Sequence, residues 1–428
     1  MIAQKSQPLA LRRLMPRTIL LILLLSLLTI PALAHPAMQD TPPVDPTGEP
    51  AFAPDTRTFP NIPAPNGLAI APLTQRLYVT SRSANQVLML DARTGAILKQ
   101  AAVGVLPWGV AVNPANNRLY VANFTSGDLY VLDATTLARI TIASLGSDAE
   151  PAFIAIHPDS GRVLVAGHGH NQLWVLAPDG VIEHSISTGG NGAWGLAVHP
   201  YLKRAYVGHR DSANVITFDG NNNWQPIATQ TITPCGASGH PFALNLNPVN
   251  NRLYVACAPE QTVSQVKIYR ASSTGLALLA NLPVSAGGPD GGGGIAINTA
   301  TNNVFFTNST SRSLTVIGSN SDRVIATVQA GVDPFGAAAD IFTGDIFIGN
   351  RAGNAITVIA DNGFGADAAA PKLTLSRRDG CEGLQITVSG RNFPIMPPAG
   401  SGHVSLRFGD VYLGHVASNG QGDFSTTV

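Results

Sequence analysis

Short runs of alternating apolar and polar residues fill most of this chain, separated by turns rich in Asn, Asp, Gly and Pro. One run, close to Leu-Tyr-Val-Ala-Asn, returns seven times at intervals of 42 to 51 residues. The second residues of the seven copies are Tyr78, Tyr120, Leu164, Tyr206, Tyr254, Phe305 and Phe347. Alternation with a period of two predicts strands, and a strand-rich repeat in the low forties is typical of a β-propeller blade.

Each repeat can be divided into four strands. In the second copy the inner strand spans 109–112, and the next three span 118–122, 129–132 and 139–143. One such sheet cannot bury both of its faces, so the copies must stack, and a closed ring leaves the fewest exposed strand edges. The pattern therefore predicts an all-β fold, a seven-bladed β-propeller.

The seventh repeat supplies only three strands, 336–339, 345–348 and 355–359. Residues 55–60 precede the first inner strand, where every other copy has an outer strand. An unpaired blade edge invites aggregation. We therefore expect this N-terminal strand to close the last blade.

The segments flanking the propeller, which we place at 55–362, have other patterns. Residues 1–34 join a basic start, an apolar run at 18–30 and a small-x-small site, which predicts a signal peptide and a secreted, periplasmic or cell-surface protein. The alternatives are a retained anchor and, because of Arg12 and Arg13, a twin-arginine signal. A Pro-rich linker follows at 35–54, and a second linker at 363–370.

The C-terminal residues, 371–428, alternate again as short strands. These strands are expected at 372–375, 384–388, 404–408, 411–416 and 424–428. Together with the Gly390-Arg391-Asn392-Phe393-Pro394 interruption, this stretch resembles the immunoglobulin-like (IPT/TIG) modules of bacterial surface proteins. The resemblance implies a small β-sandwich-like domain that is either minimal or incomplete, since such sandwiches usually have about seven strands.

Charge and cysteine content indicate which partners the protein is expected to lack and which cysteines can pair. Charged residues make up 12% of the chain and the formal net charge is zero, so we expect no nucleic-acid partner, and no membrane span once the signal is removed. Three cysteines allow one pair. Cys235 and Cys257 belong to the fifth repeat and reach the same rim, where they are either disulfide-bonded or free. Cys381 lies in the C-terminal domain and is expected to be a free thiol.

Aligning the repeats predicts which residues one rim of the ring displays. The positions before the inner strands are Ala64, Leu106, Glu150, Gly192, His240, Gly291 and Asp333. Positions in and just after the strands add aromatic and basic residues. The resulting candidate ligand site consists of Arg82, Trp108, Glu150, Trp194, His209, Arg210, His240, Phe242, Asp333 and Arg351. Aromatics with a few convergent polar groups are typical of a ligand site, and Arg binds carboxylate or phosphate in a bidentate manner.

Structural explanations compete with this hypothesis. The aromatics could wedge between neighbouring blades, and the arginines could pair with Glu150, Asp211 or Asp333. His168, His170 and His209 lie on adjacent blades and suggest a divalent metal site. The chain has no nucleophile elbow, zinc-protease or haem-attachment motif, so we expect no cofactor, with a metal at these histidines as the alternative.

The run Tyr120-Val121-Ala122-Asn123, preceded by Gly109-Val110-Ala111-Val112-Asn113-Pro114 and followed by Val131-Leu132-Asp133, resembles the YVTN family of propeller repeats. The family is varied in function. We expect a monomeric, non-enzymatic propeller whose rim binds a protein, glycan or other small molecule. The alternatives are an enzyme, either a lactonase-like metal-dependent hydrolase or a quinoprotein-type dehydrogenase subunit, and a structural surface-layer component.

Overall fold

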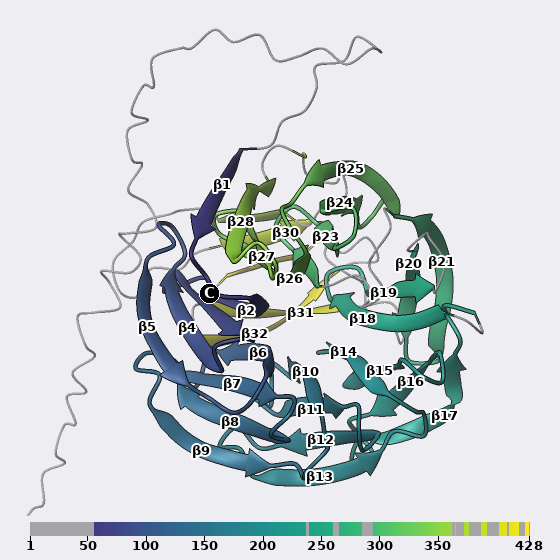
Figure 1. Ribbon diagram of the computed structural model, residues 1–428. Helices are drawn as coiled ribbons and strands as arrows, with labels where there is room; N and C mark the ends of the chain where they lie inside the picture. Colours follow the sequence, from purple (N-terminus) through teal and green to yellow (C-terminus); the bar gives the residue numbers. More distant parts are fainter. Residues whose placement is uncertain are drawn as a thin grey trace, which may run out of the picture.

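The computed structural model describes residues 55–236, 239–259, 265–284, 294–361 and 364, together with five strands between 372 and 427. Over this part, seven four-stranded antiparallel sheets surround a common axis (Figure 1), and no α-helix occurs. The predicted all-β, seven-bladed propeller is confirmed. Within the described residues, no helix is long and apolar enough to span a bilayer. The predicted signal peptide and Pro-rich linker lie outside this part.

Strands within each blade follow chain order from the axis outward. Blade 1 has β2 (Pro65–Ala71), β3 (Arg76–Ser81), β4 (Gln86–Asp91) and β5 (Ile97–Ala102), and blade 2 has β6 (Pro107–Asn113), β7 (Arg118–Asn123), β8 (Asp128–Asp133) and β9 (Arg139–Ser144). Blade 3 has β10 (Pro151–Ile156), β11 (Val163–Gly167), β12 (Gln172–Leu176) and β13 (Ile182–Ser187), and blade 4 has β14 (Ala193–His199), β15 (Arg204–His209), β16 (Asn214–Asp219) and β17 (Gln225–Ile232). Blade 5 has β18 (Gly239–Asn247), β19 (Arg252–Pro259), β20 (Gln265–Ser272) and β21 (Gly275–Pro283), and blade 6 has β22 (Ile295–Asn298), β23 (Asn303–Asn308), β24 (Ser313–Gly318) and β25 (Arg323–Gln329).

Blade 7 is built from both ends of the propeller sequence. β26 (Pro334–Ala339), β27 (Asp345–Asn350) and β28 (Ala355–Ala360) are joined by β1 (Thr56–Pro60), which pairs antiparallel with β28 from Thr56↔Ile359 to Pro60↔Ala355. The predicted N-terminal closing strand is confirmed. Phe59 of β1 is buried and contacts Gly95 of blade 1, where a Cβ atom would lie 2.3 Å from the Phe59 ring. Gly95 also has a φ of +73°, so this position favours glycine on two grounds.

The tyrosine of the repeat explains why the motif recurs. Tyr78 is buried against blade 2, and its hydroxyl donates to the Ala134 carbonyl at 2.7 Å. Tyr120 makes the same bond to the Pro178 carbonyl of blade 3, also at 2.7 Å. Burial raises the pKa of Tyr78 to about 12. Each of these side chains therefore fills the gap between two blades and satisfies its hydroxyl group on the neighbour.

The five C-terminal strands form two small sheets. β29 (Lys372–Leu375), β30 (Thr387–Arg391) and β33 (Phe424–Thr427) make one sheet in the order β29-β30-β33, and β31 (Gly402–Phe408) pairs with β32 (Val411–Ser418) in a hairpin. Strands therefore occur in each of the five regions where they were predicted. The immunoglobulin-like assignment stays a prediction, and Cys381 lies outside the described residues.

Candidate functional site

A repeated backbone feature brings the two predicted rim positions together. The residue before the inner strand adopts a left-handed conformation at Ala64, Leu106, Glu150, Gly192 and Asp333, with φ between 37° and 70°. Its carbonyl accepts the N–H of the residue that follows the second strand's end. Glu150 is bonded in this way to His168, Gly192 to Arg210, and Asp333 to Arg351. The two sets of residues aligned from the sequence are thus hydrogen-bonded neighbours on one rim.

In four blades a β-bulge immediately after this point directs one aromatic side chain toward the axis. The pairing register of inner strands shifts after Pro107, Ala193, Pro241 and Pro334. The residue after each is aromatic, and the four rings form one buried cluster, which we call the aromatic plug: Trp108, Trp194, Phe242 and Phe335. Bulges commonly re-aim side chains in this manner.

The rings of the aromatic plug pack against one another across the axis. Trp108 lies edge-on to Trp194 at 5.3 Å and to Phe335 at 5.7 Å, and Phe242 contacts Trp194 at 5.3 Å and Phe335 at 6.2 Å. All four are at most 8% exposed. These aromatics are therefore buried packing groups, as the structural explanation expected, but they meet at the centre of the ring, from blades 2, 4, 5 and 7, and not between neighbouring blades.

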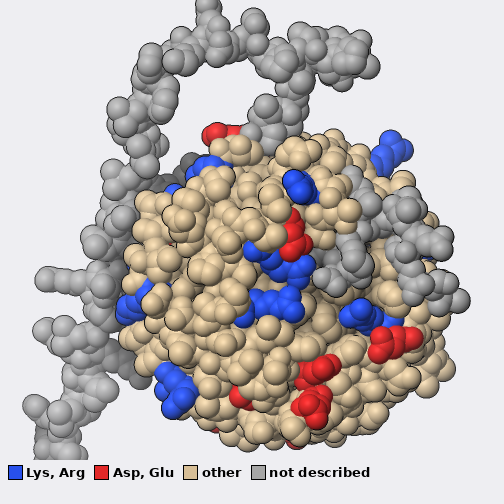
Figure 2. All heavy atoms as spheres, viewed as in Figure 1, with Lys and Arg blue, Asp and Glu red and all other residues tan. Residues whose placement is uncertain are grey.

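Three arginines lie over rings of the plug. The guanidinium carbon of Arg351 is 3.9 Å from the Phe335 ring centroid, that of Arg82 is 4.8 Å from Trp108, and that of Arg210 is 5.9 Å from Trp194. Such stacking is a cation–π interaction that also holds the planar group in place. Arg351 is bound in addition by Asp333 at 3.0 and 3.1 Å, as the structural explanation of the arginines predicted. Figure 2 shows basic side chains near the middle of the visible face, with acidic ones beside and below them.

A histidine between two carboxylates stands beside the plug. His168 Nδ1 lies 2.7 Å from Glu150 Oε2, and His168 Nε2 lies 3.6 Å from Asp211 Oδ2. The His168 ring meets the Trp194 ring edge-on at 5.3 Å. The three polar side chains are partly exposed, Asp211 the most at 53%. We call Glu150, His168 and Asp211 the His168 group; it links the rims of blades 3 and 4.

The structure does not bring the three histidines of the predicted metal site into one cluster. His209 is fully buried, next to Gly190, where a Cβ atom would stand 2.6 Å from the imidazole ring. His170 packs near Trp174, and the two ring nitrogens of His168 face Glu150 and Asp211. Within the described part of the chain, no three His, Cys, Asp or Glu side chains lie close enough together to hold a metal ion. Burial of His209 also removes it from the predicted ligand site.

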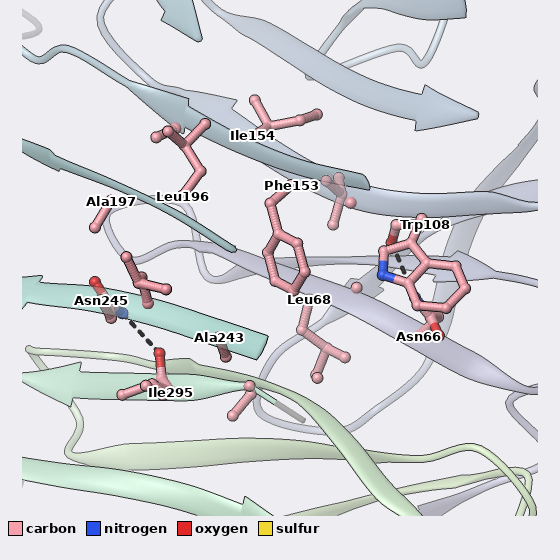
Figure 3. Close-up of a pocket in the computed structure, with 18 of the residues that line it drawn as sticks. Asn66, Leu68, Trp108, Phe153, Ile154, Leu196, Ala197, Ala243, Asn245 and Ile295 are labelled. Atoms are coloured by element: carbon pink, nitrogen blue, oxygen red, sulfur yellow. Dashed lines mark hydrogen bonds between the residues drawn. The ribbon is translucent and has the colours of Figure 1, made fainter. Parts of the chain in front are cut away.

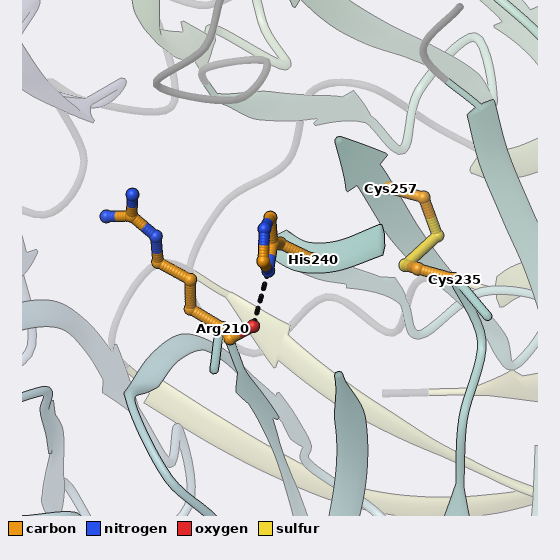
Figure 4. The surroundings of a disulfide bond; sticks show 4 residues. All are labelled: Arg210, Cys235, His240 and Cys257. Carbon is orange, nitrogen blue, oxygen red and sulfur yellow. Dashed lines mark hydrogen bonds between the residues drawn. A yellow bond between two sulfur atoms is a disulfide. The ribbon is translucent and has the colours of Figure 1, made fainter. Parts of the chain in front are cut away.

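Cys235, which precedes β18 in the sequence, is tied covalently to blade 5. The Cys235 and Cys257 sulfur atoms are bonded, with their Cα atoms 5.3 Å apart, so the pairing left open by the sequence is a disulfide (Figure 4). His240, at the start of β18, donates its Nδ1–H to the Arg210 carbonyl at 2.5 Å. The disulfide and this bond together anchor the blade 5 rim to blade 4.

Two residues outside the predicted ligand site belong to it. Phe124 packs on Trp108 and Trp194 at 5.3 and 5.7 Å, and Asp211 completes the His168 group. Phe124 is the first residue after β7, and Asp211 is the second residue after β15. The repeat alignment therefore already indicated that both residues would lie on this rim. Gly291 lies outside the described residues.

A cavity of about 340 Å³ lies on the axis directly beneath the plug (Figure 3). Trp108 and Phe335 form part of its wall, and the residues that follow them along the inner strands form the rest. The plug therefore separates the polar rim from an interior space. The rim carries charged side chains, whereas the described residues that line the cavity include no Asp, Glu, Lys, Arg or His.

This arrangement defines a seven-bladed propeller with a plugged axis and a polar, arginine-bearing rim. The fold is similar to that of Kuenenia stuttgartiensis hydrazine synthase, with a TM-score of 0.61 and 20% identity over 70% of this chain and 96% of that chain. It is also similar to virginiamycin B lyase from Staphylococcus aureus, with a TM-score of 0.58 and 12% identity over 72% and 99%. At such identities these similarities show the fold alone. No protein-family model and no curated protein sequence matches the chain.

Proposed function

We propose that this protein binds a ligand or partner bearing carboxylate or phosphate groups on the rim above the aromatic plug. The observation that carries the proposal is the set of three guanidinium groups over contiguous rings. Because Trp108, Trp194 and Phe335 touch one another, the arginines above them converge on one area. Guanidinium groups held flat lose little entropy when they bind an anion.

Arg210 is the arginine best placed to bind such a group. Among the residues that the structure describes, its guanidinium has the Trp194 ring as its contact, and Figure 4 shows the side chain extended away from the disulfide. Its own backbone is held by His240. The site therefore offers a positioned donor, to which Arg82 adds positive charge, whereas the charge of Arg351 is offset by Asp333.

We also propose that the protein works outside the cytoplasm, as a secreted, periplasmic or surface-exposed propeller. Two observations support this location. The N-terminal sequence has the form of a signal peptide, and the Cys235–Cys257 disulfide is of the kind that persists in oxidising compartments. The YVTN-like repeats and the immunoglobulin-like C-terminal pattern are consistent with such a protein.

A matched pair of ligands tests the binding function. Oligogalacturonate carries a row of carboxylates, which its methyl-esterified form lacks, and the two share a sugar backbone. Calorimetric titration is expected to show binding of the acid form and at least about tenfold weaker binding of the ester. Arg210→Ala is expected to weaken binding of the acid form by a similar factor. Arg93→Ala, a substitution on an exposed turn, is expected to leave that binding unchanged. Equal binding of both forms contradicts the proposal.

The His168 group supports a second candidate, an enzyme that uses His168 as a general base or acid. A histidine oriented by a carboxylate is a common arrangement for proton transfer. A screen with lactone and ester substrates, followed by His168→Gln, tests this candidate. Turnover that is lost in His168→Gln but kept in Arg210→Ala would favour the enzyme over the binding protein.

A further inference from the structure

The cavity beneath the aromatic plug is lined by residues from all seven inner strands. Among the described residues in its wall there is no Asp, Glu, Lys, Arg or His. Leu68, Phe153, Leu196 and Ile295 contribute much of the apolar surface, and Figure 3 shows the Phe153 ring reaching into the space between the strands. A charged molecule moved into this space would lose its hydration without gaining a counter-charge.

Polar backbone groups around the cavity are partly occupied already. The Trp108 carbonyl accepts hydrogen bonds from Thr80 Oγ1 at 2.9 Å and from Asn66 Nδ2 at 3.2 Å. The Ile295 carbonyl accepts from Asn245 Nδ2 at 2.6 Å. A third carbonyl, that of Phe335, accepts from Thr307 Oγ1 at 2.8 Å. Side chains of the protein thus satisfy some of the backbone groups that a ligand or water would otherwise bind, and the wall as a whole is mixed, with polar groups beside apolar side chains.

We propose that this cavity binds a small, neutral molecule that combines an apolar part with a hydrogen-bonding group, such as a single-ring aromatic alcohol. The volume of about 340 Å³ falls within the range of about 300–1,000 Å³ that is usual for ligand pockets. The wall excludes charge, and the remaining backbone groups can satisfy one or two hydrogen bonds. This site is distinct from the anion-binding rim, because the four rings of the plug stand between them.

Two probes of nearly equal size and different charge test the proposal. Fluorine NMR titration of the full chain with para-fluorobenzyl alcohol is expected to show saturable binding. Para-fluorobenzoate is expected to bind the cavity more than about tenfold more weakly, because its carboxylate cannot be desolvated there. Absence of binding by the alcohol, or equal binding of the two probes within the cavity, overturns the proposal.

Cavity-filling variants locate the binding. Ala155→Leu and Ala337→Leu, from blades 3 and 7, extend side chains that line the cavity and are each expected to abolish binding of the alcohol. Both variants should still bind oligogalacturonate at the rim. Arg210→Ala should lose binding of oligogalacturonate and keep binding of the alcohol. Failure of one proposal is therefore distinguishable from failure of the other. Unchanged alcohol binding in a folded filled variant overturns the cavity proposal.

Discussion

The Arg57 guanidinium forms a two-point ion pair with Asp345, 288 residues further along the chain, with contacts of 2.7 and 3.2 Å. It links the closing strand to the second strand of the same blade. Because Arg57 is 43% exposed, the pair itself contributes little to stability. The ion pair reports closure of the ring, because Arg57 and Asp345 can meet only when β1 has joined the last blade.

Closure is expected to depend on the buried Phe59 far more than on this ion pair. We predict that Phe59→Ala lowers the free energy of unfolding by about 3 kcal/mol, because the ring fills space between blades 7 and 1. Arg57→Ala, the matched control in the same strand, should cost less than about 1 kcal/mol. Urea denaturation measures both, and similar losses would contradict the proposed hierarchy.

The aromatic plug is expected to be a major stabilising unit. Trp194 contacts Trp108, Phe242 and Phe124, so Trp194→Ala should cost about 3–5 kcal/mol and Trp194→Phe clearly less. Thermal unfolding gives the comparison. If Trp194→Ala left the melting temperature unchanged, the rings would not be packed as described.

Two buried histidines predict a loss of stability in mild acid. Burial lowers the pKa of His209 to about 4, and burial likewise lowers that of His199 to about 4 in spite of its bond to Asn251. The unfolded chain takes up these protons near its ordinary pKa of 6.5, whereas the folded chain does not. Stability is therefore fully present above about pH 6.5 and should fall progressively toward pH 4.

His209→Gln tests this assignment. The variant should show a flatter dependence of unfolding free energy on pH between about 6.5 and 4 than the wild type, since one of the buried histidines whose pKa is lowered is gone. His184→Gln, on the outer strand β13, serves as the control. Direct NMR titration of His209 with a pKa near its usual value would contradict the prediction.

The disulfide predicts a thiol count and a stability change. Denatured, unreduced protein should expose one titratable thiol and reduced protein three, since the chain has three cysteines. The Cys235→Ser, Cys257→Ser double variant should lose about 2–4 kcal/mol. It should also weaken anion binding at Arg210, because Cys235 no longer anchors the chain just before His240, which holds the Arg210 carbonyl. Three thiols without reduction would exclude the bond.

Much of the fold was predictable because it depends on local pattern. The interval between copies of the repeat indicated the number of blades, and the missing strand after residue 359 indicated that β1 would complete the ring. The rim positions were also predictable. Glu150 and Asp333 occupy one position of the repeat, His168 and Arg351 occupy another, and the two positions are hydrogen-bonded to each other in both blades. Backbone register repeats with the sequence, so residues at equal positions are placed equally.

The fate of each rim side chain was not predictable in the same way. His209 and Arg210 are adjacent in sequence, yet the first is fully buried and the second lies over the plug. The three histidines of the metal hypothesis differ for the same reason: His209 is buried, His168 contacts Glu150, and His170 packs near Trp174. Side-chain direction depends on what the surrounding structure offers, such as the space over Gly190 for His209 or the Trp194 ring for Arg210.

The sequence by itself determined a ring of seven sheets, its closing strand and the rim on which polar residues gather, because repeat spacing and strand alternation are properties of neighbouring residues. Only the tertiary structure decided that four aromatics meet on the axis, that Cys235 pairs with Cys257, and that a cavity without ionisable residues lies below a charged rim. Those features arise where distant blades converge. They depend on the summed sizes and directions of side chains that no local pattern relates to one another.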